Sequence, residues 1–310
     1  GSAAYARRSG PAEGPVLTIG NFDGVHRGHQ RLIDHLQLQS KSLQLPTMLM
    51  TFEPQPREFF AGAMLPARLT RFREKVHLLE RTGLDRLLCL PFNEQTSQIP
   101  AEWFAEEFLT ELVGARYVVI GDDFRFGHER QGDFQLLQNT GARLGYEVIS
   151  VDTVLQAGDR VSSTLVRSTL SAGNFSKAAE LLGHEYFIMG RVVYGRQLGR
   201  QLGVPTANLK LQRYRAALEG VYCVTVDGVA EDGQPLQGIA NIGVRPTVDG
   251  KEPLLEVHVF DFSGDLYGRR LRVTFKHKLR DEQAFASLEL LKQQIDSDLR
   301  NARRWFAESI

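Results

Sequence analysis

The sequence predicts an α/β chain of two parts: an N-terminal doubly wound parallel-sheet domain, then a C-terminal antiparallel β-barrel with a terminal helix. In the first half, short β-rich runs alternate with longer amphipathic stretches, which is typical of βαβ units. After residue 185 the β-rich runs follow one another with turn signals and no helix between them, which favours a small barrel. The length of 310 residues fits two domains, and we expect them to cover residues 1–184 and 185–310.

Each half has its own series of expected elements. The strands of the first half are expected at residues 16–19, 47–52, 86–90, 117–120 and 147–151. Its helices are expected at residues 29–40, 71–81, 101–112 and 134–144, followed by two short helices at 163–172 and 176–182. Barrel strands are expected at residues 186–194, 221–226, 237–242, 254–260 and 270–275. A last helix is expected from about residue 281 to 306, where Phe285, Leu288, Leu291 and Ile295 recur at helical spacing.

The composition excludes several classes of partner. Lys and Arg together number 37, as do Asp and Glu, so no net charge attracts nucleic acid or an anionic membrane. No apolar run approaches the ~18–20 residues of a membrane span, and no apolar segment follows Arg7 and Arg8 as a secretory signal would require. Cys89 and Cys223 each lie in an apolar run, which is typical of buried thiols in a reducing cytosol. We therefore expect a cytoplasmic protein, of undetermined oligomeric state.

The first candidate site is the run GNFDGVHRGH at residues 20–29, between a strand and a helix. Backbone N–H groups and the helix dipole favour a phosphate at such a position. His26 and His29 flank Gly28 and can donate hydrogen bonds to phosphate oxygens. The other expected ATP- or phosphate-binding residues of this run are Gly20, Phe22, Asp23, Gly24 and Gly28. A surface turn with two solvated histidines, or a chance metal-binding pair, is the alternative interpretation.

The second candidate site is the run GDDFRFG at residues 121–127, where the strand at 117–120 ends. In parallel sheets ligands bind at the carboxyl ends of the strands, and aromatic rings alternating with an arginine can hold a flat ring and a phosphate. The candidate flavin-binding residues are Asp123, Phe124, Arg125, Phe126 and Gly127. The alternative is an ordinary strand end followed by a turn.

The third candidate site opens a helix with the run SSTLVR at residues 162–167. Ser163 and Thr164 can contact a phosphate or can serve only as helix caps. Arg167, one turn later, can reach a polyphosphate.

A glycine-rich segment opens the second half. Its backbone N–H groups can surround the phosphates of ATP, although it is not a Walker loop; the expected contacts are Gly190, Gly195, Gly199, Arg200 and Gly203. Thr206 and Asn208 lie two residues apart on an extended segment and so point to one side. Their oxygens suit Mg²⁺ that is shared with phosphates. The alternative is a flexible turn before a proline-anchored strand.

Taken together, these motifs resemble a known family. His-x-Gly-His at 26–29 with Ser-Ser-Thr-x-x-Arg at 162–167 resembles the HxGH nucleotidyltransferases, which have a Rossmann-like fold, and the 121–127 run is similar to their flavin branch. Residues 199–208, 241–247 and 255–258 resemble riboflavin kinases. The resemblance is therefore to the bacterial bifunctional riboflavin kinase/FMN adenylyltransferase family, over roughly residues 15–300. Two positions depart from it, because Gln55 and Tyr194 stand where the family commonly has histidine.

The resemblance implies two reactions that use ATP and Mg²⁺: phosphorylation of riboflavin to FMN, then adenylylation of FMN to FAD with release of pyrophosphate. A phosphomonoester has its second pKa near ~6 and is already ionised, so the second reaction needs positioning donors, here His26, His29 and Arg167, rather than a base. The riboflavin hydroxyl does need a base, and Glu256 matches the family's. Asn241, Arg245 and Thr247 match its flavin-binding motif.

Three alternatives accompany these assignments. Strand alternation puts Glu256 on the face opposite Leu255 and Val257, so it is also interpretable as an outward-facing strand residue. A degenerate aminoacyl-tRNA synthetase shares the His-x-Gly-His pattern, but the chain lacks a Lys-Met-Ser-Lys-Ser loop. A flavin-binding sensor or storage protein on the same scaffold is the remaining alternative, and it would release no pyrophosphate from FMN and ATP.

Overall fold

The computed structural model describes residues 14–60, 65–195, 203–213, 215–247 and 250–309, with the side chains of residues 244–252 outside the description. The chain divides into two compact units. The first unit contains Gly1–Leu65 and Lys75–Ser162, and the second contains Pro66–Glu74 and Ser163–Ile310. This division follows contacts, and the expected domain boundary between residues 184 and 185 stays a prediction.

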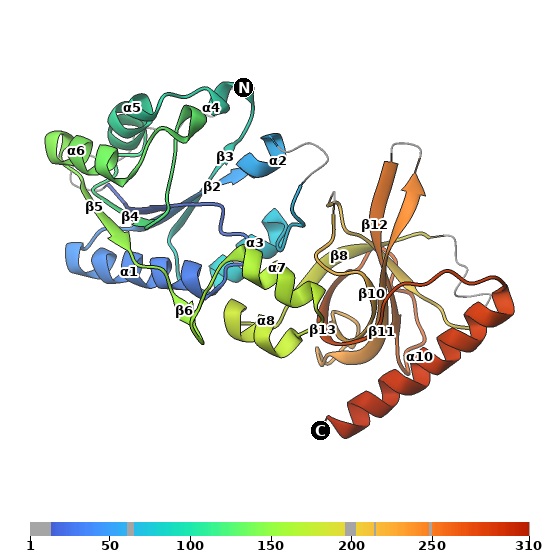
Figure 1. Ribbon diagram of the computed structural model, residues 1–310. Coiled ribbons are helices and arrows are strands. Elements are labelled where there is room, and N and C mark those ends of the chain that lie inside the picture. Colours follow the sequence, from blue (N-terminus) through green and yellow to red (C-terminus); the bar gives the residue numbers. More distant parts are fainter. Residues whose placement is uncertain (1–13, 61–64, 196–202, 214, 248–249, 310) are drawn as a thin grey trace. The chain divides into compact units, whose positions relative to one another are not determined.

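The first unit is built on a five-stranded sheet in the order β3-β2-β1-β4-β5, with every pair of neighbours parallel (Figure 1). The strands are β1 (Val16–Ile19), β2 (Thr47–Glu53), β3 (Arg86–Pro91), β4 (Tyr117–Gly121) and β5 (Glu147–Val151). Helix α1 (Arg27–Leu43) covers one face, while the other is covered by α5 (Ala101–Trp103), the π-helix η2 (Phe104–Leu112) and α6 (Phe134–Leu144). The predicted doubly wound parallel sheet is confirmed.

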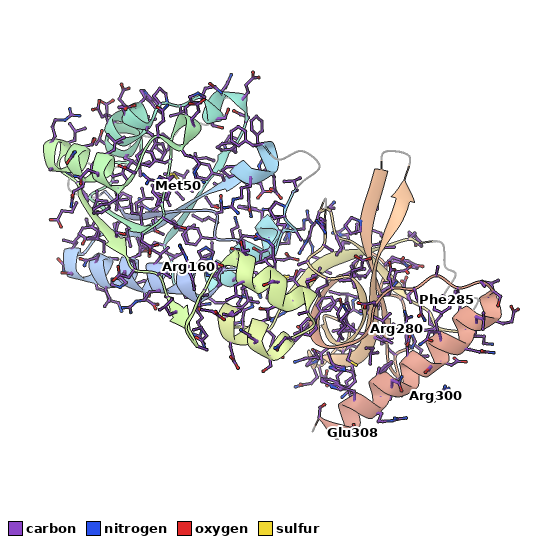
Figure 2. The ribbon with its side chains drawn as sticks, in the orientation of Figure 1. Met50, Arg160, Arg280, Phe285, Arg300 and Glu308 are labelled. Atoms are coloured by element: carbon purple, nitrogen blue, oxygen red, sulfur yellow. The ribbon has the colours of Figure 1, made fainter. Side chains whose placement is uncertain are left out.

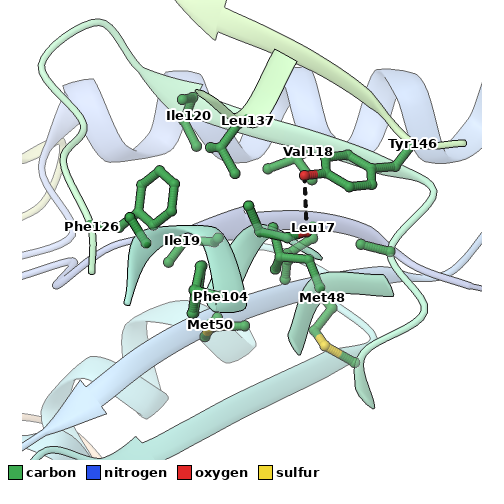
Figure 3. Packing of buried hydrophobic residues seen from close by; sticks show 14 residues of the cluster. Leu17, Ile19, Met48, Met50, Phe104, Val118, Ile120, Phe126, Leu137 and Tyr146 are labelled. Carbon is green, nitrogen blue, oxygen red and sulfur yellow. Dashed lines mark hydrogen bonds between the residues drawn. The ribbon is translucent and has the colours of Figure 1, made fainter. Parts of the chain in front are cut away.

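Both faces of this sheet are buried because apolar residues occupy consecutive strand positions. Val16 and Val119 pack with Leu36 of α1. Their neighbours Leu17 and Val118 face the opposite core, which includes the residues labelled in Figure 3. In that core the Tyr146 hydroxyl donates a hydrogen bond of 3.1 Å to the Ala105 carbonyl, so the ring is held without leaving a buried polar group unpaired.

The short elements of the first unit were not predicted. They are α2 (Pro56–Phe60), α4 (Glu94–Ser97), the 3₁₀ turn η3 (His128–Arg130) and the hairpin of β6 (Leu155–Gln156) and β7 (Asp159–Arg160). None is long enough for its apolar residues to repeat at a helical or strand period. The predicted helix at 101–112 divides into α5 and η2, whereas that at 71–81 is confirmed as α3 (Phe72–Glu80).

The second unit contains α7 (Ser163–Ser171), α8 (Phe175–Leu182) and a closed six-stranded barrel in the order β10-β11-β12-β9-β8-β13 (Figure 1). All neighbouring strands are antiparallel. The strands are β8 (Phe187–Val193), β9 (Ala207–Lys210), β10 (Gly220–Asp227), β11 (Leu236–Thr247), β12 (Gly250–Val259) and β13 (Arg270–Arg280). The predicted barrel is thus confirmed, with β11, β12 and β13 longer than expected and with β9 as a strand that was not predicted.

The start and the buried face of the last helix differ from the prediction. Helix α10 runs from Leu288 to Glu308, because Ser287 caps it by accepting a hydrogen bond from the backbone N–H of Leu290. Leu288, expected in the buried stripe, is 60% exposed. The buried residues of α10 are instead Asp298, Ala302 and Phe306. Within the described part of the chain, none of the helices has the length and apolar character needed to cross a lipid bilayer.

Candidate active sites

The loop from Gly20 to His26 follows β1 with an unusual backbone. Phe22 and Val25 have φ angles of 47° and 44°, in the left-handed region that non-glycine residues rarely adopt. Each such residue costs about 1–3 kcal/mol and persists only where its surroundings hold it. Both side chains are buried, which supplies that hold. Strain of this kind is typical of a functional loop rather than a solvated surface turn.

Two stacked histidines lie where this loop meets α1. The rings of His26 and His29 lie 3.6 Å apart at 17°. His26 caps α1 through Nδ1, which accepts a hydrogen bond of 3.4 Å from the backbone N–H of His29. A neutral His26 therefore carries its proton on Nε2, where it can be donated to an anion. A Cβ at Gly28 would lie 3.1 Å from the His26 ring, so the missing side chain at Gly28 makes room for the stack.

The environment of His29 keeps this side chain neutral. Burial is the largest cause that lowers the pKa of His29 well below 6.5, with His26 and Lys75 adding positive charge nearby. Its Nδ1 atom is buried without a hydrogen-bond partner. The ring of Phe22, itself buried, packs 5.0 Å from the His29 ring. His29 is thus arranged to donate a hydrogen bond as a neutral side chain. It would carry a positive charge that neutralises a phosphate only if a bound anion raised its pKa.

Lys75 is a residue that the sequence did not single out. It lies on α3, is fully buried, and its ammonium group donates a hydrogen bond of 3.0 Å to the Thr51 hydroxyl. The Thr51 hydroxyl in turn donates to the carbonyl of Asn21, at 3.4 Å, in the strained loop. Asp23 is also buried there. A lysine in the middle of an amphipathic helix gives no sequence signal, because only the tertiary structure shows that it is buried.

The run at residues 121–127 combines one core residue with exposed polar ones. Phe126 is buried, and a Cβ at Gly132 would lie 2.6 Å from its ring. Phe124 is less buried and stacks on Phe126 at 5.7 Å. Asp123 pairs with Arg160 at 2.7 Å, and Arg125 pairs at 2.9 Å with Asp133, which caps α6. Gly127 has a φ of 74°, and a Cβ there would meet the Ala101 backbone at 2.6 Å.

An exposed aromatic cluster at the carboxyl ends of β2 and β3 was also missed. Phe52, Phe59, Phe60 and Phe92 meet edge to face at 5.2–5.9 Å. Phe60 is 67% exposed, which is unusual for so large an apolar side chain. The nearby Gln55 is buried, and its Nε2 atom has no hydrogen-bond partner. The available sequence signal was the pair Phe59 and Phe60, which begins three residues after the Phe-Glu-Pro-Gln-Pro run ends.

Ser163, Thr164 and Arg167 lie in α7, which belongs to the second unit. They are therefore described separately from the two histidines of the first unit. Arg167 donates a hydrogen bond from Nε to the carbonyl of Ala67, and Thr164 is exposed.

The barrel places three predicted residues in one row. In the strand register Glu256 of β12 lies opposite Asn208 of β9 on one side and opposite Asn241 of β11 on the other. Cross-strand partners point to the same face, about 4.5–5.5 Å apart at Cβ. Leu255 and Val257 are buried on the opposite face, so the expected alternation holds. We call Asn208, Glu256 and Asn241 the Glu256 row.

Asn208 is the most buried member of the row, at 5% exposed. Its Nδ2 donates to the carbonyl of Thr206 at 3.4 Å, while its Oδ1 is buried and has no hydrogen-bond partner. A Cβ at Gly195 would lie 2.5 Å from this amide, so the backbone after β8 passes directly over Asn208. A buried acceptor without a donor fits a cation ligand. Within the described residues, no group of three or more His, Cys, Asp or Glu side chains is arranged to hold a metal.

Two carboxylates that follow Glu256 in the sequence have partners of their own. Glu282 accepts a hydrogen bond of 3.4 Å from the Asn241 amide. Asp261 is held by both terminal nitrogens of Arg303, at 2.9 and 3.0 Å, and this pairing lowers the pKa of Asp261. A carboxylate held in this way is a poor proton acceptor.

The remaining predicted barrel residues are placed as follows. Gly190 lies inside β8, where a Cβ would be 3.0 Å from the Leu209 side chain, so its geometry indicates packing. Gly203 has a φ of 81° in an open turn. Gly199 and Arg200 lie outside the described residues, and only the backbone of Arg245 and Thr247, in β11, is described. Tyr194 is 74% exposed and stacks on Tyr267 at 3.9 Å.

A hollow beside the start of α10 was not predicted. Its volume is about 450 Å³, and it is largely open to solvent. Phe285 lines it together with Gln283, Leu290 and Gln294. The guanidinium of Arg280 lies 5.8 Å from the centre of the Phe285 ring, and Figure 2 labels both residues. The hollow lies where residues 281–287 are not helical. The sequence analysis had expected these residues to belong to the last helix.

The comparisons with known proteins cover nearly the whole chain. A family model described as FAD synthetase matches residues 9–165, and one described as riboflavin kinase matches residues 182–306. A bifunctional riboflavin kinase/FMN adenylyltransferase of Escherichia coli K12 is 49% identical over 96% of this chain and 94% of its own length. One of Pseudomonas fluorescens is 50% identical over the same shares. A crystal structure titled macrolide-efflux protein, from Streptococcus pneumoniae, matches 94% of this chain and 95% of its own with a TM-score of 0.76 and 32% identity.

Proposed function

Since the chain belongs to the family of bifunctional riboflavin kinase/FMN adenylyltransferases, we propose that it uses ATP to convert riboflavin to FMN, and a second ATP to convert FMN to FAD and pyrophosphate. The observation that carries the kinase half is the Glu256 row, which sets a carboxylate between two amides on one barrel face. The strained loop and its two stacked histidines support the adenylyltransferase half.

In the first reaction the nucleophile is the 5′-hydroxyl of riboflavin, which is not ionised at neutral pH. Glu256 accepts its proton as the hydroxyl oxygen attacks the γ-phosphorus of ATP, and ADP leaves. Asn241 lies opposite Glu256 in the strand register, and its proposed role is to orient the flavin. Arg245 and Thr247 are the other proposed flavin contacts.

The residues of the barrel fit Mg²⁺. Asn208 would hold it through Oδ1, together with Thr206 and oxygens of the ATP phosphates. The ion would neutralise charge on the phosphates during transfer. The chain's own contribution is to keep Asn208 in place, and the close backbone at Gly195 does so. Gly195, Gly199, Arg200 and Gly203 stay the proposed phosphate contacts. Gly190 stays one through its backbone alone, since the space of its missing side chain is taken by Leu209.

In the second reaction the ionised phosphate of FMN attacks the α-phosphorus of ATP, and pyrophosphate leaves. His26 and His29 donate hydrogen bonds to phosphate oxygens, with Gly20, Phe22, Asp23, Gly24 and Gly28 shaping the loop. Ser163, Thr164 and Arg167 stay proposed contacts for ATP phosphates. Phe124, Asp123, Arg125 and Gly127 are the proposed flavin contacts, and the buried Phe126 supports Phe124 from beneath.

A single assay tests both halves. The chain is incubated with riboflavin, ATP and Mg²⁺, and FMN, FAD and pyrophosphate are followed by chromatography and a coupled phosphate assay. FMN should appear first and FAD second, with one pyrophosphate for each FAD. A flavin sensor or storage protein would bind flavin without releasing pyrophosphate, and that outcome would overturn the proposal. Because both reactions consume ATP, we also propose that the protein acts in the cytoplasm.

A further inference from the structure

A nine-residue segment of the first half of the chain belongs to the barrel unit. This segment, Pro66–Glu74, groups with Ser163–Ile310 and not with its neighbours in sequence. We call it the strap. Leu69, Thr70 and Glu74 of the strap are buried. No sequence motif marks it, and it matches none of the nucleotide- or flavin-binding motifs.

The strap is held by Arg213, three residues beyond the end of β9. The guanidinium NH1 group donates to the carbonyls of Arg68 and Leu69, at 3.0 and 3.2 Å, and the NH2 group donates to the carboxylate of Glu74. The side chains of Arg213 and Glu74 are 0% and 1% exposed. The Tyr186 hydroxyl adds a hydrogen bond of 3.3 Å to the Leu69 carbonyl. A buried ion pair with this many hydrogen bonds has one well-defined geometry.

Glu74 also holds strand β8. Its Oε1 accepts a hydrogen bond of 2.9 Å from the backbone N–H of Met189. Strand β9 pairs with β8 only at Val192 and Val193, so Met189 lies beyond the part of β8 that β9 covers. The chain turns away after β9, where Gln212 has a φ of 45°. Glu74 therefore provides at this seam the acceptor that a longer β9 would have provided.

The two strands joined by this carboxylate carry the proposed Mg·ATP site. Gly195 follows β8, and Asn208 lies in β9, paired with Val193. A shift of β8 against β9 would change the close approach of Gly195 to the Asn208 amide, which is 2.5 Å from a Cβ built at Gly195. Sub-ångström to 1 Å displacements of this kind cost up to about a hundredfold in rate.

We infer that Glu74 is a positioning residue for the kinase reaction, although it lies in the half of the sequence that matches the FAD synthetase family. This rests on the proposed function. The strap is thus a working part of the kinase module, and its carboxylate sets the β8–β9 register on which Mg·ATP binding depends.

The test uses the full chain. Glu74→Gln keeps the size of the side chain and a hydrogen-bond acceptor for Met189, but removes the charge that holds Arg213. We expect the KM for Mg·ATP in riboflavin phosphorylation to rise roughly tenfold to a hundredfold, while the KM for riboflavin and the rate of FAD formation from supplied FMN stay within about twofold. Glu80→Gln makes the same change at an exposed position of the same helix, and should leave all of these unchanged.

A second variant separates positioning from stability. Glu74→Gln combined with Arg213→Met removes both buried charges, which is often neutral for stability. Its melting midpoint should return toward wild type, while the KM for Mg·ATP stays raised. Recovery of both together would overturn the inference, as would an unchanged KM in a folded Glu74→Gln protein. If the wild-type chain makes no FMN at all, the proposed function fails instead.

Discussion

The strained loop from Gly20 to His26 in the first unit departs from regular backbone geometry, whereas the Glu256 row of the second unit depends on regular strand geometry. The loop holds Phe22 and Val25 at positive φ, and His26 at its end caps α1. The row needs only the antiparallel register of three strands to bring Asn208, Glu256 and Asn241 together. The difference follows the proposed chemistry: an ionised phosphate needs converging donors, whereas an alcohol needs a carboxylate next to oxygen ligands.

The largest effect is expected from a substitution that removes the proposed base, Glu256, and leaves the histidine donors intact. Glu256→Gln keeps size and hydrogen bonding, but removes basicity. FMN formation should fall on the order of 10²–10⁴-fold, while FAD formation from supplied FMN stays within about threefold. Initial rates by chromatography measure both. If turnover survives in a folded variant, Glu256 is an ordinary strand residue and Glu282, which touches Asn241, becomes the next candidate; Asp261 does not, because Arg303 holds it.

The converse substitution removes the proposed hydrogen-bond donor His29 and leaves Glu256 intact. His29→Ala should lower FAD formation by about 10²–10³-fold, the usual cost of one lost transition-state donor. Riboflavin phosphorylation should stay near wild type, since His29 and the Glu256 row belong to different units. Near-normal FAD formation in this variant would contradict the assignment. A melting curve is the control, because removing the ring also leaves a gap beside Phe22.

A smaller effect is expected from crowding the row. A Cβ at Gly195 would lie 2.5 Å from the Asn208 amide, so Gly195→Ala must move one of the two. Overpacking costs about 1–3 kcal/mol, and kcat/KM for Mg·ATP in the kinase reaction should fall roughly fivefold to a hundredfold. Gly121→Ala is the control in the kinase assay, because Gly121 has no positive φ and a Cβ there would lie no closer than 3.7 Å to another residue. Equal losses in both variants would show that the contact with Asn208 is unimportant.

The smallest effect is a pH dependence of stability that arises from His29, in the first turn of α1. The folded-state pKa of His29 lies below 6.5, so below that pH the unfolded chain binds a proton that the folded chain does not. This part of the stability is fully present above pH 6.5 and is lost as the pH falls toward the folded-state pKa. Urea unfolding from pH 5 to 8 should therefore show a shallower decline in His29→Asn than in wild type. Identical slopes would mean that His29 is not held neutral.

The sequence predicted the parallel sheet and the barrel because both depend on local periodicity and turn residues. It also named Asn208, Glu256 and Asn241 as candidates from motifs, and their roles stay predictions; only the strand register shows that they lie side by side. It missed Lys75 and the strap, whose burial comes from contacts far away in sequence. It also placed the start of the last helix too early. Phe285 continues the helical spacing of the apolar residues that follow it, but the helix begins only after the Ser287 cap.

The strap has a consequence for how the protein is made. Arg213 is synthesised about 140 residues after Glu74, which at 5–20 residues per second is roughly 7–28 seconds later. Throughout that interval the nascent chain presents a carboxylate and an apolar Leu69 whose binding partners do not yet exist. The second unit can complete its fold only after the ribosome has delivered both ends of this pair. Slow codons between the two would lengthen that exposure without changing a single amino acid.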